Sequence, residues 1–298
     1  MNPRERLGRV GVWWGALGVE PAAVEREAAA AVEGLGYDTL WYSETPVGKE
    51  ALAHAAILLG ATERIAVASG IANIYARDPL AAANGAAALG EAFGDRFLLG
   101  IGVSHAPAVQ MRGHDYGKPL TAMRTYLDAM DGATPRFPVP GGGKVPRALA
   151  ALRRRMLELA RDRSDGAHPY FVPVEHTARA REVLGDGPLL APEQAFVLES
   201  DPAKAREAAR NHTKVYLRLP NYVNNLRELG FGDEDLDGAG SDRLVDEIVA
   251  WGDVDAVAAR VRAHHDAGAD HVCVQPLGSS VDESLAWLRE LAPAVVQD

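Results

Sequence analysis

Two side chains that can transfer protons come directly after apolar stretches of the sequence. His105 follows the apolar run Arg96–Ser104, and Glu44 ends the run Asp38–Glu44. Histidine titrates near neutral pH without perturbation, and a carboxylate in an apolar opening can have a raised pKa. Hydride transfer to or from a carbonyl needs such a partner, because charge develops on the oxygen. His105 and Glu44 are therefore candidate acid/base residues. The alternatives are a loop histidine, and a glutamate that starts a helix or forms an ion pair.

The stretch Arg64–Tyr75 has the β-branched residues of a buried strand, but Ser69 and Gly70 interrupt it. Glycine inside a strand pattern marks a bulge, a bend, or a place where a ligand comes close to the backbone. Gly70, with Ser69 before it and Ile71 after it, is therefore a candidate for contact with a bound molecule. An ordinary bulge without a ligand explains the same pattern.

Composition limits the classes of partner. The 298 residues carry 41 acidic and 31 basic side chains, and the formal charge of -10 argues against non-specific nucleic-acid binding. No segment approaches the roughly 20 apolar residues of a membrane span, and we see no signal peptide. Cys273 is the only cysteine, which excludes an intramolecular disulfide and fits a cytoplasmic location. His264 and His265 have no third ligand at metal spacing, so we expect no metal site.

Short apolar runs alternate with helical patterns along almost the whole chain. The expected strands are Arg9–Gly15, Asp38–Glu44, Arg64–Tyr75, Arg96–Ser104, Arg147–Leu152, Gly166–Val172, Leu189–Ser200 and Asp270–Gly278. The expected helices are Glu20–Gly36, Glu50–Gly60, Asp78–Gly94, Pro119–Met130, Arg153–Arg163, Glu175–Gly185, Asp253–Ala269 and Asp282–Val296. This alternation predicts an α/β fold with a parallel sheet.

About eight such units favour a (β/α)8 TIM barrel over a doubly wound sheet, and no GxGxxG motif follows the first strand. We expect one domain over residues 1–298. The charged segment Asp201–Gly252 is too long for one crossover, so it predicts a helical insertion late in the barrel. The Pro- and Gly-rich segment Pro135–Pro146 is a loop: a linker, a long connection or a mobile lid.

A barrel gathers the carboxyl ends of its strands around one opening, where ligands bind. Trp13 and Trp14 are adjacent and face opposite sides of their strand, so one of them can line this opening. Both being core is the alternative. Ser104 and Ser43 can donate hydrogen bonds, although either can be a simple turn residue. The candidate binding residues are Trp14, Ser43, Ser69, Gly70, Ile71, Asn73, Ser104, Ala151, Leu152, Arg153, Arg154 and Tyr170.

Four stretches in order carry a family resemblance: LGYDTLWYSE, ASGIANIYARDPLAAA, GDRFLLGIGVSH and AGADHVCVQPLG. They resemble the bacterial luciferase-like superfamily, and most of all its branch of oxidoreductases that use the deazaflavin coenzyme F-420. The resemblance covers Val10 to about Leu291. It implies a TIM barrel with a late helical insertion, and a homodimer.

The resemblance also implies roles for two segments. Members carry a non-prolyl cis peptide in a bulge against the flavin or deazaflavin ring, which corresponds here to the Gly70–Ile71 bond. Members also bind the cofactor phosphate at a turn that begins a helix, which corresponds here to Ala148–Ala160. Relatives usually have Gly-Pro after this strand, whereas this chain has Arg153 and Arg154. Arginine can supply charge to a phosphate directly, and the alternative is a solvated basic helix face.

These features lead to three functional hypotheses. The first is an F-420-dependent oxidoreductase that transfers a hydride between the deazaflavin and a small organic substrate. The second is an FMN-dependent luciferase-like monooxygenase on the same fold. The third is a barrel that binds a flavin or deazaflavin without catalysis, which the altered arginine turn would favour.

Overall fold

The structure is a computed structural model that describes residues 3–133, 136 and 138–296. Its strands are β1 (Val10–Trp13), β2 (Thr39–Ser43), β3 (Ala66–Asn73), β4 (Phe97–Gly102), β5 (Arg147–Ala150), β6 (Gly166–His168), β7 (Leu189–Leu190), β8 (Glu193–Val197), β9 (Val249–Trp251) and β10 (Val272–Pro276). A short 3-10 helix, η1 (Gly15–Val19), follows β1. The helices are α1 (Pro3–Leu7), α2 (Ala22–Gly34), α3 (Ala51–Leu59), α4 (Pro79–Ala92), α5 (Ala106–Met111), α6 (Pro119–Ala133), α7 (Arg154–Arg163), α8 (Val174–Leu184), α9 (Pro202–Tyr216), α10 (Pro220–Glu228), α11 (Asp233–Leu236), α12 (Asp242–Ile248), α13 (Val254–Asp266) and α14 (Val281–Val295).

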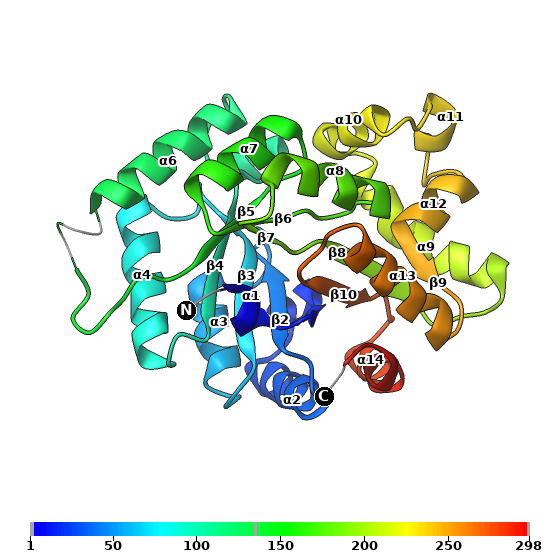
Figure 1. Cartoon of the computed structure of the whole chain (residues 1–298), viewed down its shortest axis with the longest axis horizontal. Helices are drawn as coiled ribbons and strands as arrows, with labels where there is room; N and C mark the ends of the chain where they lie inside the picture. The colour runs from blue at the N-terminus through cyan, green and yellow to red at the C-terminus, as the bar shows by residue number, and fades with distance from the viewer. Residues whose placement is uncertain (1–2, 134–135, 137, 297–298) are drawn as a thin grey trace.

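All strands belong to one sheet in the order β7-β6-β5-β4-β3-β2-β1-β10-β8-β9, and every pairing between them is parallel. The sheet is curled, and helices cover its outside (Figure 1). The predicted α/β fold with a parallel sheet is therefore confirmed. The described residues form ten strands rather than the eight that we predicted.

Two local features explain the larger strand count. The predicted strand Leu189–Ser200 is divided at Ala191 and Pro192 into β7, which pairs with β6, and β8, which pairs with β10. Proline has no N–H for the ladder, so a strand is easily interrupted there. The second feature is β9, an apolar stretch within the segment predicted to be helical, which pairs with β8. The rest of that segment contains α9, α10, α11 and α12.

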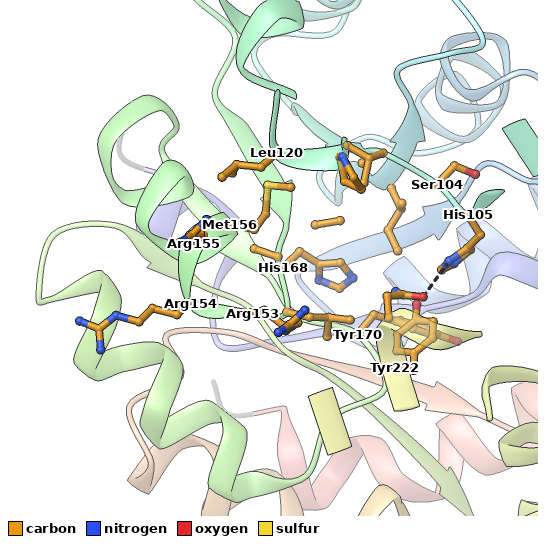
Figure 2. Close-up of a pocket in the computed structure, with 18 of the residues that line it drawn as sticks. Ser104, His105, Leu120, Arg153, Arg154, Arg155, Met156, His168, Tyr170 and Tyr222 are labelled. Carbon is orange, nitrogen blue, oxygen red and sulfur yellow. Dashed lines mark hydrogen bonds between the residues drawn. The ribbon is translucent and has the colours of Figure 1, made fainter. Parts of the chain in front are cut away.

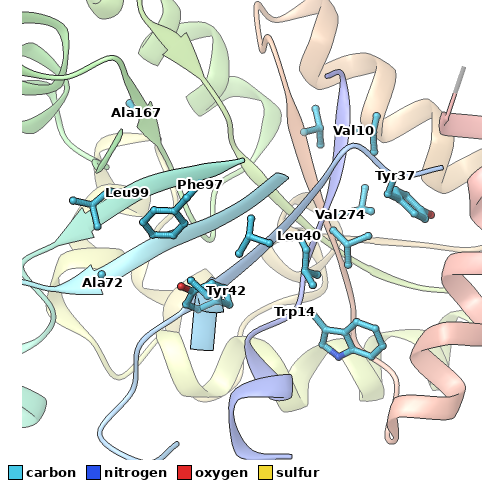
Figure 3. Close-up of a cluster of buried hydrophobic side chains, with 14 of the residues drawn as sticks. Val10, Trp14, Tyr37, Leu40, Tyr42, Ala72, Phe97, Leu99, Ala167 and Val274 are labelled. Carbon is cyan, nitrogen blue, oxygen red and sulfur yellow. The ribbon is translucent and has the colours of Figure 1, made fainter. Parts of the chain in front are cut away.

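Alternate residues of each strand pack into two different hydrophobic clusters. Val12, Leu40 and Val67 belong to the cluster between the sheet and the helices (Figure 3). Trp13 and Trp41 belong to the other cluster, which also contains side chains from α9, α10 and α12. This alternation follows from the two-residue period of a β-strand. The second cluster also contains Tyr170 and Phe171, which follow β6.

The helix boundaries follow the predicted capping signals closely. Asp78 accepts a hydrogen bond from the Ala81 N–H at 2.9 Å, with Pro79 as the first residue of α4. Gly94, just after α4, has a φ of 63°. In the predicted loop Pro135–Pro146, positions 135 and 137 lie outside the described residues, and residues 138–146 form neither helix nor strand.

Candidate active site

A cavity of about 610 Å³ lies beside the ends of β4, β5 and β6. The starts of α6 and α7 contribute to its wall, and α10 supplies a further part from the late helical segment (Figure 2). Eight predicted residues line it: Ile71, Ser104, His105, Ala151, Leu152, Arg153, Arg154 and Tyr170. The other predicted residues do not line it: Trp14, Ser43, Glu44, Ser69, Gly70 and Asn73.

His105 sits between β4 and α5 with its ring against α10. Its Nδ1 lies 3.1 Å from Oδ1 of Asn221, and its ring centroid lies 5.5 Å from that of Tyr222. An amide oxygen only accepts hydrogen bonds, so Nδ1 carries the proton and Nε2 has a free lone pair. Burial lowers the pKa of His105, and the hydrogen bond with Asn221 partly opposes this shift. The ring is therefore neutral near pH 7, and Nε2 can accept a proton.

The opposite part of the cavity wall is the N-terminus of α7. Arg153 is its N-cap residue, and no side chain caps this end of the helix. Arg153 pairs with Glu228 and Arg154 with Glu158, with Nε–Oε1 distances of 2.7 and 2.9 Å. Arg155 is exposed, lines the cavity, and forms no ion pair with any described residue. N–H groups at the start of a helix, next to a guanidinium without an ion-pair partner, are chemically suited to an anion.

The interruption of β3 at Gly70 is a bulge held by its neighbours. The register with β2 and β4 shifts at this point, and Gly70 has a φ of 37°. A Cβ atom on Gly70 would lie 2.5 Å from Cζ3 of Trp13, so only glycine fits. The Ser69 hydroxyl donates to the Gly100 carbonyl at 2.9 Å and accepts from the Gly100 N–H at 3.0 Å. These contacts join the bulge to β4.

The predicted cis peptide at Gly70–Ile71 is wrong, because no peptide bond among residues 3–133, 136 and 138–296 is cis. The chain bends instead through the positive φ of Gly70, which glycine adopts readily. Ile71, the residue after the bulge, is the part of β3 that lines the cavity.

Glu44 belongs to an ion-pair cluster next to Asn73, the last residue of β3. Its carboxylate pairs with the guanidinium of Arg77, and its Oε2 accepts from the Asn73 N–H at 2.8 Å. The Glu44 side chain is 2% exposed. Arg77 also donates to Glu50 at 2.8 Å. The cluster therefore fixes the end of β3, and none of Glu44, Asn73 and Arg77 lines the cavity.

The remaining predicted residues, Trp14, Asn73 and Ser43, lie away from the cavity lining. Trp14 packs in the outer cluster with Leu40 and Tyr42 (Figure 3). Trp13 belongs to the inner cluster. Asn73 is buried, and its Oδ1 accepts from the Tyr75 N–H at 2.9 Å. Ser43, half-buried at the end of β2, pairs in register with Ile71. Both tryptophans are buried and neither lines the cavity, as in the alternative that both are core; Trp13 contacts Tyr170, which does line it.

Tyr170, two residues after the end of β6, lines the cavity. Its hydroxyl donates to Oε1 of Gln275 at 2.9 Å and lies 2.8 Å from the hydroxyl of Tyr216. Its ring is 4.9 Å from that of Trp13, measured between centroids. Tyr216 comes from α9, so this contact ties the late helical segment to the strands.

The sequence profile described as luciferase-like monooxygenase matches residues 7–271 of this chain. The chain belongs to this family. The resemblance seen in the sequence is thereby confirmed.

Two named relatives of this luciferase-like chain are a reductase and a putative oxidoreductase. The chain is 29% identical over 210 residues to a 5,10-methylenetetrahydromethanopterin reductase of Methanolobus tindarius, with 61% of this chain and 64% of the relative covered. It is 26% identical to a putative coenzyme F-420-dependent oxidoreductase of Mycobacterium tuberculosis, with 87% and 92% covered. The chain thus spans just under two thirds of the length of the Methanolobus reductase.

Solved structures share the fold of this luciferase-like chain. An F-420-dependent secondary alcohol dehydrogenase, in complex with an F-420–acetone adduct, superimposes with a TM-score of 0.78 at 15% identity, with 97% of this chain and 99% of that chain covered. The FMN-bound oxygenating constituent of 3,6-diketocamphane monooxygenase from Pseudomonas putida gives 0.71 at 16% identity, with 96% and 98% covered. At these identities the likeness shows the fold alone.

Several cavity residues of this family member were missed by sequence reasoning. The main ones are Tyr116, Leu120, Arg155, Met156, Asn221, Tyr222 and Glu228. Arg155 continues the predicted arginine pair, so its position gave a usable signal. Asn221 and Tyr222 come from α10, and no sequence pattern indicates that this helix reaches the strand ends.

Metal and membrane features are absent from the part of the chain that the structure describes. No group of three or more His, Cys, Asp or Glu side chains there could hold a metal ion. In that same part, none of the helices combines the length and apolar character needed to cross a membrane.

Proposed function

We propose that this luciferase-like protein is an F-420-dependent oxidoreductase that transfers a hydride between the deazaflavin and a small organic substrate. One observation carries the proposal: the uncapped start of α7 with Arg155 lines one wall of the cavity, and His105, whose pKa is lowered by burial, lines another. A cofactor with a phosphate and a flat ring needs the first feature. A hydride transfer coupled to a proton needs the second.

The residues present fit such a cofactor. Arg155 and the first N–H groups of α7 would hold its phosphate, in place of the Gly-Pro turn of relatives. Leu120, Met156 and Ile71 offer apolar surface to a ring. The ring, when bound, supplies the hydride chemistry, and the chain supplies orientation and the proton.

His105 would handle the proton at Nε2. In substrate oxidation, Nε2 accepts the proton of a hydroxyl as the carbon loses hydride, and in the reverse direction it returns that proton. The hydrogen bond from Nδ1 to Asn221 keeps this tautomer. Glu44, our second acid/base candidate, would instead keep the end of β3 in place through Arg77 and the Asn73 N–H. Gly70 and Ser69 would keep the bulge that presents Ile71 to the ring.

The competing cofactor is FMN, because a structural neighbour at TM-score 0.71 contains it. A titration of the purified protein with F-420 and with FMN, followed by fluorescence, separates the hypotheses. We expect tighter binding of F-420, and the bound protein should then oxidise or reduce small alcohols or ketones. Tighter binding of FMN would favour a monooxygenase. Binding of neither would favour a barrel without redox activity and would overturn the proposal.

The finer description of the fold belongs to the same proposal. Residues 189–197 pair with β6 through β7 and with β10 through β8, so we count them as one bent strand that closes an eight-stranded barrel. On this count, residues 1–298 form one domain, and about 201–252 are an insertion.

We further propose a homodimer located in the cytoplasm. Light scattering of the purified protein tests the dimer.

A further inference from the structure

His168, the last residue of β6, stacks with two tryptophan rings. Its ring centroid lies 4.9 Å from that of Trp13 at an interplanar angle of 18°, and 4.8 Å from that of Trp41 at 19°. The side chain is 0% exposed to solvent. The two stacks fix the plane of the imidazole. The ring can then only exchange its two edges by a half-turn about the Cβ–Cγ bond.

One hydrogen bond decides which way the ring is flipped and where its proton sits. Nδ1 lies 2.7 Å from the carbonyl oxygen of Ala191, which only accepts, so Nδ1 carries the proton. The Sγ atom of Cys273 lies 3.9 Å from this same Nδ1. Nε2 is therefore unprotonated and carries a lone pair. It has no hydrogen-bond partner among the described residues.

Burial keeps the His168 ring neutral. It lowers the pKa of His168 to about 4, although the bond with Ala191 opposes the shift. At neutral pH, Nε2 is thus a hydrogen-bond acceptor and too weak a base to take a proton from a substrate. An anion would be repelled by this lone pair. An uncharged donor would be attracted.

His168 also lines the cavity, and its ring lies among the other lining side chains in Figure 2. A buried acceptor without a partner costs roughly 1–3 kcal/mol. Nε2 has no donor among the described residues, and His168 lines the cavity, so a molecule bound there can supply the missing hydrogen bond. The rings of Trp13 and Tyr170, 4.9 Å apart by their centroids, offer a surface suited to a flat molecule.

We propose that Nε2 of His168 accepts a hydrogen bond from an uncharged N–H on the edge of a planar heterocycle bound in the cavity. The inference deepens the proposed function and rests on it, because flavin and deazaflavin rings both carry an imide N–H. His168 then orients the ring, while His105 handles the proton. Nothing in this arrangement depends on the identity of the substrate.

Two substitutions separate the two nitrogens of His168. His168→Asn keeps an amide near the Nδ1 position, so it can still bond to Ala191 but has no acceptor at the Nε2 position. His168→Gln has the opposite property, because its longer amide reaches the Nε2 position. Both lose the stacked ring to the same extent. They are therefore matched controls, and circular dichroism and thermal denaturation check the folding of each.

The readout is the dissociation constant of F-420, measured by fluorescence titration in parallel with FMN. We expect His168→Asn to weaken binding about tenfold relative to the wild type, as the loss of one hydrogen bond implies, and His168→Gln to weaken it less. Equal affinities in wild type and both variants would overturn the inference and leave the proposed function intact. Failure of the wild type to bind either cofactor would overturn both.

A measurement on the wild type removes any dependence on the variants. With ring-¹⁵N-labelled histidine, the Nε2 resonance of His168 should have the position of an unprotonated nitrogen in the free protein. It should move toward that of a hydrogen-bonded nitrogen when F-420 is added. An Nε2 resonance that is unchanged at saturating F-420 would exclude the proposed contact.

Discussion

The Nδ1 atom of His105 lies 3.1 Å from the Oδ1 atom of Asn221, although 116 positions separate them in the chain. Asn221 belongs to α10, and both residues line the cavity. Asn221, in the late helical segment, therefore determines which nitrogen of His105 carries the proton. The proposed reaction depends on a contact between two distant parts of the chain.

Substitution of Asn221 should move the pKa of His105 in a direction set by the new side chain. Asn221→Ala removes the hydrogen bond that favours the charged ring, so the pKa should fall further. Asn221→Asp places a carboxylate there and should raise it by roughly one unit. A ring-¹⁵N titration, with His105 assigned through His105→Asn, measures both shifts.

The same variants should shift the pH dependence of the reaction. The neutral ring accepts the proton in substrate oxidation, so kcat/KM should rise with pH through an apparent pKa below the usual 6.5. This rise should move to higher pH in Asn221→Asp. Asn224→Ala, an exposed change on the same helix, is the control and should leave the profile unchanged. Identical profiles in all the variants would separate Asn221 from the chemistry.

Removal of the free guanidinium at the start of α7 should weaken the binding of F-420. Arg155→Ala should raise the dissociation constant about tenfold, and added salt should reduce the difference from wild type, because the contact is exposed to solvent. Arg161→Ala is a matched control at the other end of α7, where Arg161 pairs with Asp162 at 2.8 Å. An equal effect of both changes would indicate a general charge effect rather than an anion site.

Alanine at position 70 should destabilise the protein through two separate effects. The φ of 37° costs roughly 1–2 kcal/mol for a residue with a side chain, and the new Cβ would overlap the Trp13 ring. We expect the free energy of unfolding to fall by about 2–4 kcal/mol in urea. Gly94→Ala has a similar positive φ with no atom within 4 Å, so it measures the first effect alone. Equal losses in both variants would show that the Trp13 ring moves aside.

Glu193 in β8 should make the protein less stable as the pH rises. Its Oε2 accepts from the Phe171 N–H at 3.0 Å, while its Oε1 has no partner among the described residues. Burial raises the pKa of Glu193 from 4.5 to about 8. The unfolded chain releases this proton near pH 4.5 and the folded chain only near pH 8, so stability falls between these values.

Glu193→Gln removes this pH-dependent loss. The gain in unfolding free energy over the wild type should grow from pH 5 to pH 8, by an amount on the order of 3 kcal/mol. Chemical denaturation of both proteins at several pH values measures the difference. Contributions from the buried histidines are common to both proteins and cancel. A difference that does not change with pH would show that Glu193 is already ionised in the folded protein.

Local signals were enough for much of the fold and for part of the cavity. The alternation of apolar runs and helical patterns predicted the parallel sheet, and the carboxyl ends of its strands supplied His105, Arg153 and Tyr170 to one cavity. These features depend on period and order along the chain, which sequence records directly. Pro192 is also evident in the sequence. The division of the strand there, however, depends on the pairing of β7 with β6 and of β8 with β10.

Other features needed the tertiary structure because they depend on contacts between distant residues. Adjacent tryptophans must face opposite ways, yet only the packed sheet decides that Trp13 faces inward and Trp14 outward. The sequence left Glu44 as either an acid/base group or an ion-pair partner, and only the fold places Arg77, 33 positions away, beside it. The bulge glycine was predictable, whereas the contact with Trp13 that leaves no room for a Cβ atom appears only in the fold.

The sequence by itself determined the family, the α/β architecture and the set of residues at the strand ends, because these follow from residue types and their order. Only the tertiary structure decided which of them share a cavity, that α10 holds His105, and that the Nε2 of His168 is left without a partner. Hydrogen bonds and burial act over a few ångströms in space, and distance along the chain does not predict which groups come that close.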